Sequence, residues 1–179
     1  NTRLVDVGHV DAGNGQSNFF PNNSALAMEP LVNMESRKVR FLTGKPRYVV
    51  GLIRAMFQLK AWEMQIEWEG GSYSGKSLLL SVCNGPRTGS TFMMAPDAQV
   101  DDGLLDVVLA DDMPMSRVLR VLPRLLNGSH LAHPKVTCFQ TPWLKIQCNP
   151  GTPVHADGEM LSNSAETITY TIHPGKLTL

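Results

Sequence analysis

A stretch of strictly alternating residues constrains the fold of this 179-residue chain more than any other feature. From Trp62 to Trp68 every second residue is apolar, and glutamate or glutamine fills each position between them. Side chains of a strand point alternately to opposite faces, so this pattern predicts a half-buried strand with an acidic outer face. Gly70-Gly71-Ser72 predicts a turn, and the almost wholly apolar run 77–83 predicts the returning strand of a β-hairpin.

Further strands are predicted on both sides of this hairpin. The stretch 19–32 has strand-like apolar residues that Pro21 and Pro30 interrupt, and the basic segment 37–45 is predicted to be a surface loop. Because strands dominate, we expect one mainly β domain over residues 1–179, an antiparallel β-sandwich with two or more peripheral helices. Apolar segments bounded by turn residues predict the other strands at 4–7, 104–110, 136–140, 143–148, 154–160 and 167–172.

Two helices are predicted from apolar residues at helical spacing. The first has Pro46 in its first turn and ends near Lys60. The second begins near Pro114, should be kinked by Pro123, and is stopped by Gly128. The predicted apolar stripes are Val49, Leu52, Ile53, Met56 and Phe57 on the first helix, and Val118, Leu119, Leu122, Leu125 and Leu126 on the second. On the second helix this stripe is expected to face the core, with Arg117, Arg120 and Arg124 on the opposite side.

The composition excludes several classes of protein. Lys plus Arg and Asp plus Glu both number 16, so the net charge is zero and a broad electrostatic hold on nucleic acid is not expected. The three cysteines form no C-x-x-C pair, which disfavours a disulfide framework or a structural zinc site. No apolar run reaches the roughly 20 residues that a transmembrane helix needs. We therefore expect a cytoplasmic protein; peripheral membrane contact, a lipid substrate and the oligomeric state are left open.

Three short segments could carry chemistry. Asn84–Ser90 follows a buried strand and could cradle phosphate, but it lacks the spacing of known phosphate loops, so a plain turn is favoured. Residues 97–106 include four carboxylates that could hold a hard cation, although acidic residues are also common in turns. His155–Glu159 contains a D-G-E turn in which a carboxylate could act as a general base. His130 and His133 could ligate a metal, but their neighbours favour a loop.

The order of these and other short segments is more specific than any one of them. In chain order they are Val5-Asp6-Val7-Gly8, Phe20-Pro21-Asn22, Asn84-Gly85-Pro86, Ala95-Pro96-Asp97-Ala98, Asp101-Asp102-Gly103-Leu104-Leu105-Asp106, Leu125-Leu126-Asn127-Gly128-Ser129-His130, His133-Pro134 and Asp157-Gly158-Glu159. The series resembles the C-terminal domain of the bacterial diacylglycerol kinase and lipid kinase family, whose relatives include sphingosine and ceramide kinases. The resemblance covers most of the chain and is strongest from Lys76 to Leu179.

The chain departs from the family in three places. Ala27 stands where the family usually has glycine, and Gly89-Ser90-Thr91 stands where a glycine cluster is common, so the local loops are expected to differ. The G-G-D-G-T loop of the family's N-terminal nucleotide-binding domain is absent from residues 1–179. The resemblance therefore implies the lipid-substrate side of a two-domain kinase, and this chain alone is expected to be inactive.

The resemblance also implies roles for particular residues. Glu159 of the D-G-E segment would accept the proton of the lipid hydroxyl. Asp102 would bind a structural Mg²⁺ through its side chain, with main-chain carbonyls of Gln99 and Leu104 as further ligands. ATP, the phosphoryl donor, would lie mainly on the missing domain.

Two hypotheses of different classes follow. The leading one is the substrate-side domain of an ATP-dependent kinase of diacylglycerol or a similar lipid. The alternative is a non-catalytic β-sandwich module that binds lipid or a protein partner. A related kinase acting on NAD is disfavoured, because the matching segments are those of the lipid branch.

Overall fold

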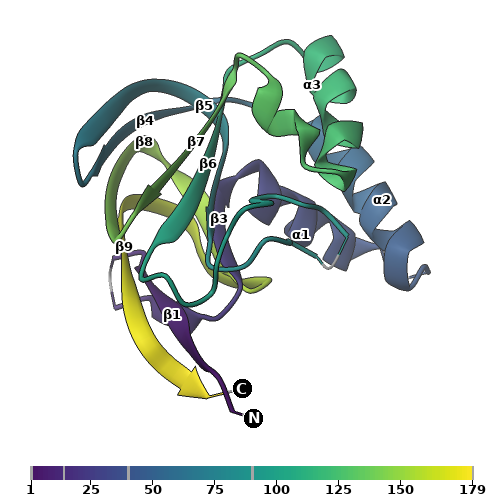
Figure 1. Ribbon diagram of the computed structural model, residues 1–179. Helices are drawn as coiled ribbons and strands as arrows, with labels where there is room; N and C mark the ends of the chain where they lie inside the picture. The colour runs from purple at the N-terminus through teal and green to yellow at the C-terminus, as the bar shows by residue number, and fades with distance from the viewer. Residues whose placement is uncertain (1, 14, 40, 90, 179) are drawn as a thin grey trace.

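The protein consists of a curved antiparallel sheet and a layer of helices (Figure 1). The computed structural model describes residues 2–13, 15–39, 41–89 and 91–178. Arg40 of the predicted basic loop and Ser90 of the predicted glycine-containing loop lie outside these residues. The strands are β1 (Leu4–Asp11), β2 (Ser17–Phe20), β3 (Asn23–Ala27), β4 (Trp62–Trp68), β5 (Gly71–Cys83), β6 (Leu105–Asp111), β7 (Val136–Thr141), β8 (Trp143–Ala156) and β9 (Glu159–Thr178). The α-helices are α1 (Met28–Lys38), α2 (Gly44–Met56) and α3 (Met115–Val121), and the 3₁₀ helices are η1 (Leu122–Leu126) and η2 (Ser129–Ala132).

Two long strands, β5 and β8, organise the sheet. β5 pairs with β3, β4 and β6, and β8 pairs with β3, β4 and β9, always antiparallel. β4 and β3 lie one after the other between them: Ile66 of β4 lies opposite Ile146, and Leu26 of β3 lies opposite Val154. The sheet then continues through β9 and β1 to β2 on one side and through β6 to β7 on the other.

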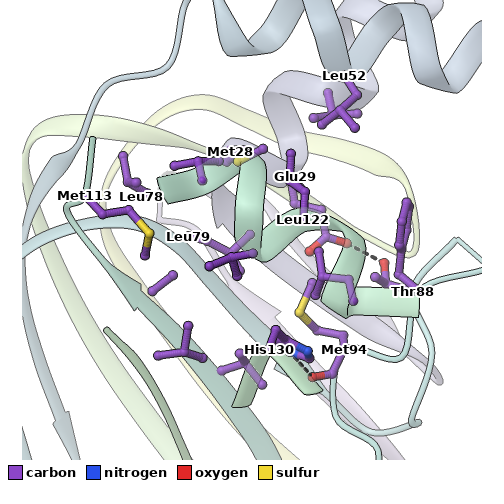
Figure 2. A pocket seen from close by; sticks show the side chains of 18 residues that line it. Met28, Glu29, Leu52, Leu78, Leu79, Thr88, Met94, Met113, Leu122 and His130 are labelled. Atoms are coloured by element: carbon purple, nitrogen blue, oxygen red, sulfur yellow. Dashed lines mark hydrogen bonds between the residues drawn. The ribbon is translucent and has the colours of Figure 1, made fainter. Parts of the chain in front are cut away.

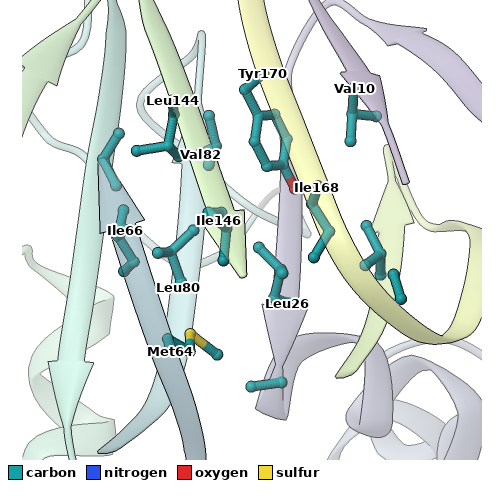
Figure 3. Close-up of a cluster of buried hydrophobic side chains, with 14 of the residues drawn as sticks. Val10, Leu26, Met64, Ile66, Leu80, Val82, Leu144, Ile146, Ile168 and Tyr170 are labelled. Atoms are coloured by element: carbon teal, nitrogen blue, oxygen red, sulfur yellow. The ribbon is translucent and has the colours of Figure 1, made fainter. Parts of the chain in front are cut away.

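The core forms where this sheet curves over itself. Its buried side chains come from β1 to β6, β8 and β9 and include Leu26, Met64, Leu80, Ile146 and Tyr170 (Figure 3). Burial of apolar surface is the main driving force for such a closure. The predicted class, a mainly antiparallel β-sandwich with peripheral helices, is confirmed.

The predicted hairpin is confirmed as β4 and β5. Trp62, Met64 and Ile66 are buried, and the glutamates between and beside them are exposed. The predicted strand 154–160 is divided by a turn at Asp157 and Gly158, so that its two halves belong to β8 and β9.

Helix α1 was not predicted. The sequence suggested an irregular strand over 19–32 and a loop over 37–45, but β3 ends at Ala27, α1 starts at the next residue and α2 already starts at Gly44. Pro30 lies in the first turn of α1, where an N–H has no intrahelical partner, so proline does not interrupt the helix. Ala27 has a φ of 67°, a conformation that glycine adopts more readily, at the position where the family resemblance led us to expect glycine.

The helices pack together on one side of the sheet (Figure 1). They share an apolar cluster with β5 and its neighbours: Met28, Val32, Ala55, Leu78, Met113 and Val118. The expected distortion at Pro123 is present, because α3 gives way to η1 at Leu122, and Gly128 follows with a φ of 79°. Within the described residues, no helix is long and apolar enough to cross a bilayer.

The predicted apolar stripes of α2 and α3 are only partly buried. Val49, Ile53 and Phe57 are 52%, 50% and 88% exposed, and Leu119 and Leu126 of the second stripe are also more than half exposed. On α2 the small residues face the neighbouring helix instead: Ala55 is buried, and a Cβ on Gly51 would stand 2.6 Å from the Cβ of Ser36 in α1. Close packing of α1 on α2 therefore leaves Val49, Ile53 and Phe57 facing outward.

Candidate functional site

A polar pocket of about 410 Å³ lies where the β8–β9 turn, the start of α1 and the loop after β5 meet. Its lining is dominated by amide, hydroxyl, imidazole and carboxylate groups: Asn22, Asn23, Glu29, Asn33, Thr88, Gly89, His155, Asp157 and Gly158. A pocket of this chemistry can hold a polar group, since polar side chains fix the orientation of a ligand through hydrogen bonds.

The D-G-E segment forms one wall of this pocket as a tight turn. Asp157 and Gly158 have φ values of 45° and 83°, as in the two-residue hairpin turns that favour Asp-Gly. The Asp157 carboxylate accepts the backbone N–H of Asn23 at 2.9 Å, and Asn33 Nδ2 donates to the Gly158 carbonyl at 2.5 Å. The turn is thereby fixed to β3 and α1, and Glu159 follows it as the first residue of β9.

Glu29 is a buried carboxylate at the centre of the site. Its Oε1 accepts hydrogen bonds from Asn23 Nδ2 at 2.9 Å and from the Thr88 hydroxyl, and His155 Nε2 lies 3.6 Å away. The Gly158 N–H donates to His155 Nδ1 at 3.2 Å, so in the neutral ring the proton is on Nε2, facing Glu29. The other oxygen of Glu29, Oε2, is buried without a hydrogen-bond partner among the described residues.

These neighbours determine the charge state of Glu29. Burial alone raises the pKa of a carboxyl group, because it disfavours the charged form. Here the side chain of His155, which faces the carboxylate, together with the hydrogen bonds of Thr88 and Asn23, outweighs burial and holds the pKa of Glu29 below its ordinary value. Glu29 is therefore ionised at neutral pH, with one oxygen unsatisfied.

A second, apolar pocket of about 90 Å³, drawn in Figure 2, shares lining residues with the polar one. Fifteen of its eighteen lining residues are apolar, and they come from α1, α2, β5, β6, α3, η1, β7, the loop after β5 and the connection between β6 and α3. Glu29 and Thr88 line both pockets and therefore form their shared wall. His130 also lines the apolar pocket, where its Nε2 contacts the Met94 carbonyl at 3.1 Å and burial lowers its pKa.

The segments that carry the family resemblance are joined by hydrogen bonds. The buried Asn84 side chain donates to the carbonyls of Asp6 and Pro21, both at 2.9 Å, and its N–H donates to the Asn22 carbonyl. Asn22 in turn lies beside Asn23, whose carbonyl accepts the N–H of Asp157. Because the N–H groups of Asn84 and its neighbour Gly85 are both bonded to the Asn22 carbonyl, this part of the predicted loop is a structural turn, not a phosphate cradle.

The acidic segment forms a loop next to the same junction. Asp102 is exposed; its carboxylate accepts the N–H of Leu104 at 3.0 Å and Gln140 Nε2 at 3.4 Å. Asp6 holds the loop through the N–H of Gly103 at 2.7 Å. The buried Asp106 has one oxygen, Oδ2, without a hydrogen-bond partner in the described part of the chain.

This loop carries oxygen donors of the kind that a divalent cation binds. Burial raises the pKa of Asp106 to about 6; a hydrogen bond from Gln140 opposes that shift, and the nearby charges of Asp102 and Asp97 add to it. A cation would relieve this repulsion, and oxygen donors are the ligands that Mg²⁺ prefers. No cluster of three or more His, Cys, Asp or Glu side chains with metal-binding geometry occurs among the described residues, so main-chain carbonyls would have to complete such a site.

The predicted site residues fall into two groups. Gln99, Asp102 and Leu104 lie together on the acidic loop, whereas Glu159 lies at the start of β9, exposed and outside the residues that line the polar pocket. His130 and His133 make separate backbone contacts, His130 to Met94 and His133 to the N–H of Lys135.

Sequence reasoning missed Glu29 and the surrounding polar groups. The available signal was a single charged residue inside the otherwise apolar stretch Ala25–Val32. A lone carboxylate in such a run is rarely buried without partners. The partners Asn23, Thr88 and His155 are distant from one another in the sequence, and only the fold brings them together.

Comparison with known proteins defines the class of this domain. Residues 25–179 match the family described as the YegS C-terminal NAD kinase beta sandwich-like domain. The match covers most of the chain and includes the end of β3, the helices, the acidic loop and the D-G-E turn. The chain belongs to this family.

Individual relatives agree with this assignment. A diacylglycerol kinase from Mycobacterium tuberculosis is 26% identical over 159 residues, covering 88% of this chain and 51% of the relative. A Shewanella frigidimarina protein named "Probable lipid kinase YegS-like" is 30% identical over 154 residues, covering 84% of this chain and 48% of its own length. The crystal structure of a diacylglycerol kinase from Bacillus anthracis has the same fold, with a TM-score of 0.65 at 16% identity, and covers 99% of this chain and 53% of that structure. The chain thus spans about half the length of the curated relatives it matches.

Proposed function

We propose that this chain is the lipid-binding half of an ATP-dependent lipid kinase that phosphorylates a hydroxyl of diacylglycerol or a similar lipid. One observation carries the proposal beyond family membership: a polar pocket and an apolar pocket share a wall made of Glu29 and Thr88. An acylated molecule with a free hydroxyl has the same division between a polar and an apolar part.

The two pockets would hold different parts of the lipid. The apolar pocket would take part of an acyl chain: its 90 Å³ admits several methylene-sized groups, since one water-sized sphere needs about 10–15 Å³. The polar pocket would take the glycerol portion. A ligand hydroxyl that donated to Oε2 of Glu29 would supply the hydrogen bond that this buried oxygen lacks.

Glu159 would act as the general base, as the family resemblance implies. Its position directly after the turn that lines the polar pocket supports this role, because the fixed turn limits where its side chain can reach. Glu159 would take the proton of the lipid hydroxyl while the oxygen attacks the γ-phosphorus of ATP in line with the departing ADP oxygen. Glu29 would position the lipid and remain ionised.

The remaining parts of the proposal concern ATP and Mg²⁺. ATP would be held by a second domain with a G-G-D-G-T loop, and reading the coding sequence upstream of the Asn1 codon tests this directly. Mg²⁺ would be held by the Asp102 side chain and the main-chain carbonyls of Gln99 and Leu104, and would there neutralise the carboxylates around Asp106.

The decisive experiment is phosphoryl transfer from radiolabelled ATP to dispersed diacylglycerol by the protein that joins this chain to its nucleotide-binding domain. Glu159→Gln should lower kcat by about 10²–10⁴-fold, the usual contribution of general-base catalysis, with little change in unfolding temperature. Glu166→Gln is the matched control, because Glu166 is also an exposed glutamate of β9. Equal activity of the Glu159 variant and the control would refute the catalytic role.

The alternative, a non-catalytic module that binds lipid or a protein partner, is favoured by one feature. Glu159 is exposed and lies outside the lining of the polar pocket. A module of this kind would bind diacylglycerol equally well with Glu159→Gln and would transfer no phosphate even when joined to a nucleotide-binding domain.

A further inference from the structure

Large apolar side chains are exposed mainly on one layer of the molecule. The described residues include nine large hydrophobic side chains that are strongly exposed, and seven of them lie on the helical layer or on the connection between α1 and α2: Phe41, Val49, Ile53, Phe57, Met115, Leu119 and Leu126. Phe41 and Phe57 are 82% and 88% exposed. A concentration of exposed apolar groups of this kind marks an interaction surface.

Three of these residues form a regular stripe along α2. Val49, Ile53 and Phe57 follow one another at intervals of four residues, which places them on one side of a helix. They face away from α1, because Gly51 and Ala55 occupy the contact with that helix. We call Phe41, Val49, Ile53 and Phe57 the α2 face.

Charge is distributed just as unevenly. Residues 28–60 and 113–126, which contain the three α-helices and η1, carry ten of the sixteen Lys and Arg residues. They carry only two of the sixteen Asp and Glu residues, Glu29 and Glu35, and both are buried. The rest of the chain holds the other six basic and fourteen acidic residues, so a net charge of zero conceals a strong excess of basic residues in these two segments.

We infer that the α2 face docks the domain on the surface of an anionic lipid bilayer. A basic layer that exposes aromatic and aliphatic side chains has the two properties of interfacial membrane helices: apolar groups that enter the acyl boundary and cations that attract anionic headgroups. Basic charge does not favour a second copy of the same face, because two such layers would repel each other.

The α2 face lies close to residues that line the apolar pocket. Leu52, which precedes Ile53 on α2, lines the apolar pocket, and so does Leu122 of η1 (Figure 2). A bilayer in contact with the α2 face would therefore lie next to elements that enclose the apolar pocket. Only this consequence rests on the proposed function; the docking itself does not require phosphoryl transfer.

The test is cosedimentation of the 179-residue chain with vesicles of phosphatidylglycerol and phosphatidylcholine that contain no diacylglycerol. The double variant Ile53→Ser/Phe57→Ser should bind the vesicles at least about tenfold more weakly. Burial of one such apolar side chain in the bilayer contributes more than about 1.4 kcal/mol, and 1.4 kcal/mol corresponds to a factor of ten in affinity. The matched control is Leu4→Ser/Phe19→Ser, because Leu4 and Phe19 are 60% and 57% exposed on β1 and β2. The control should bind as the wild type does.

Two further measurements separate the possible outcomes. Binding should fall in about 1 M salt, where the screening length is about 3 Å, and should be weak on vesicles of phosphatidylcholine alone. Glu159→Gln should bind vesicles normally, so a failure of the proposed catalysis is distinguishable from a failure of docking. The inference is overturned if the α2 double variant binds as the control does. It is also overturned if the wild-type chain does not bind anionic vesicles. That includes the result in which the chain self-associates through the α2 face and does not bind them.

Discussion

Ala110→Leu tests whether the apolar pocket is a binding site or a packing defect. Ala110 lies on β6, where it pairs with Leu79 and Val136, and its side chain lines the pocket. An empty cavity lowers stability by about 24 cal/mol per Å³, so the 90 Å³ pocket costs the free domain at most about 2 kcal/mol. A leucine that fills this space should recover part of that amount, and the pocket would then be closed to an acyl chain.

Ala110→Leu should raise the stability of the domain and lower its affinity for lipid, and two assays measure these effects. Urea denaturation should show a gain of up to about 2 kcal/mol, or roughly 4–8 °C in unfolding temperature for a domain of this size. Titration calorimetry with a short-chain diacylglycerol should show that binding is lost. Ala61→Leu is the control, because Ala61 is also partly buried near the helical layer but does not line the pocket. Undiminished lipid binding by Ala110→Leu would refute the assignment of the pocket, whatever its stability.

Two other predictions concern the acidic loop and the helical layer. Mg²⁺ should raise the unfolding temperature of the wild-type chain, and Asp102→Ala should abolish that increase; an equal increase in both proteins would exclude Asp102 as a ligand. Glu35 of α1 pairs with Lys38 of the same helix at 2.5 Å and with Arg54 of α2 at 2.8 Å, and hydrogen bonds from these residues and Gln58 lower its pKa from 4.5 to about 2. Because the folded-state pKa is the lower one, the stabilisation is complete above about pH 4.5 and is lost as the pH falls toward 2. Glu35→Gln should therefore lower the free energy of unfolding by about 1 kcal/mol at pH 7, and this difference should shrink through that range in urea titrations; a difference independent of pH would contradict the argument.

The strands were predictable because a sheet with one buried face imposes a local pattern on the sequence. In β4 apolar and polar residues alternate from Trp62 to Trp68, and this alternation indicates directly which side chains are buried in the core. Helix α1 has no such pattern: it contains Pro30, follows a residue of positive φ, and buries the carboxylates Glu29 and Glu35. Its helical state depends on contacts with α2 and the sheet, and no window of the sequence contains those contacts.

The side of α2 that faces the protein could not be predicted for a related reason. Periodicity shows that Val49, Ile53 and Phe57 share a side, but it does not show which side faces the protein. The contact with α1 is decided by Gly51 and Ala55, because only small residues permit so close an approach. The apolar stripe was therefore real, but Val49, Ile53 and Phe57 are exposed on the side of α2 that does not contact α1.

The site was predictable only where its chemistry is carried by consecutive residues. The D-G-E turn and the acidic loop are continuous in sequence and could be identified, whereas the pocket behind the turn is assembled from β3, α1, the loop after β5 and the end of β8. Glu29 joins these parts, since it contacts Asn23, Thr88 and His155 and lines both pockets. A change at this carboxylate would therefore disturb the polar and apolar halves together. For that reason Glu159, exposed at the edge, and Ala110, in the apolar wall, are the positions at which catalysis and lipid binding can be altered separately.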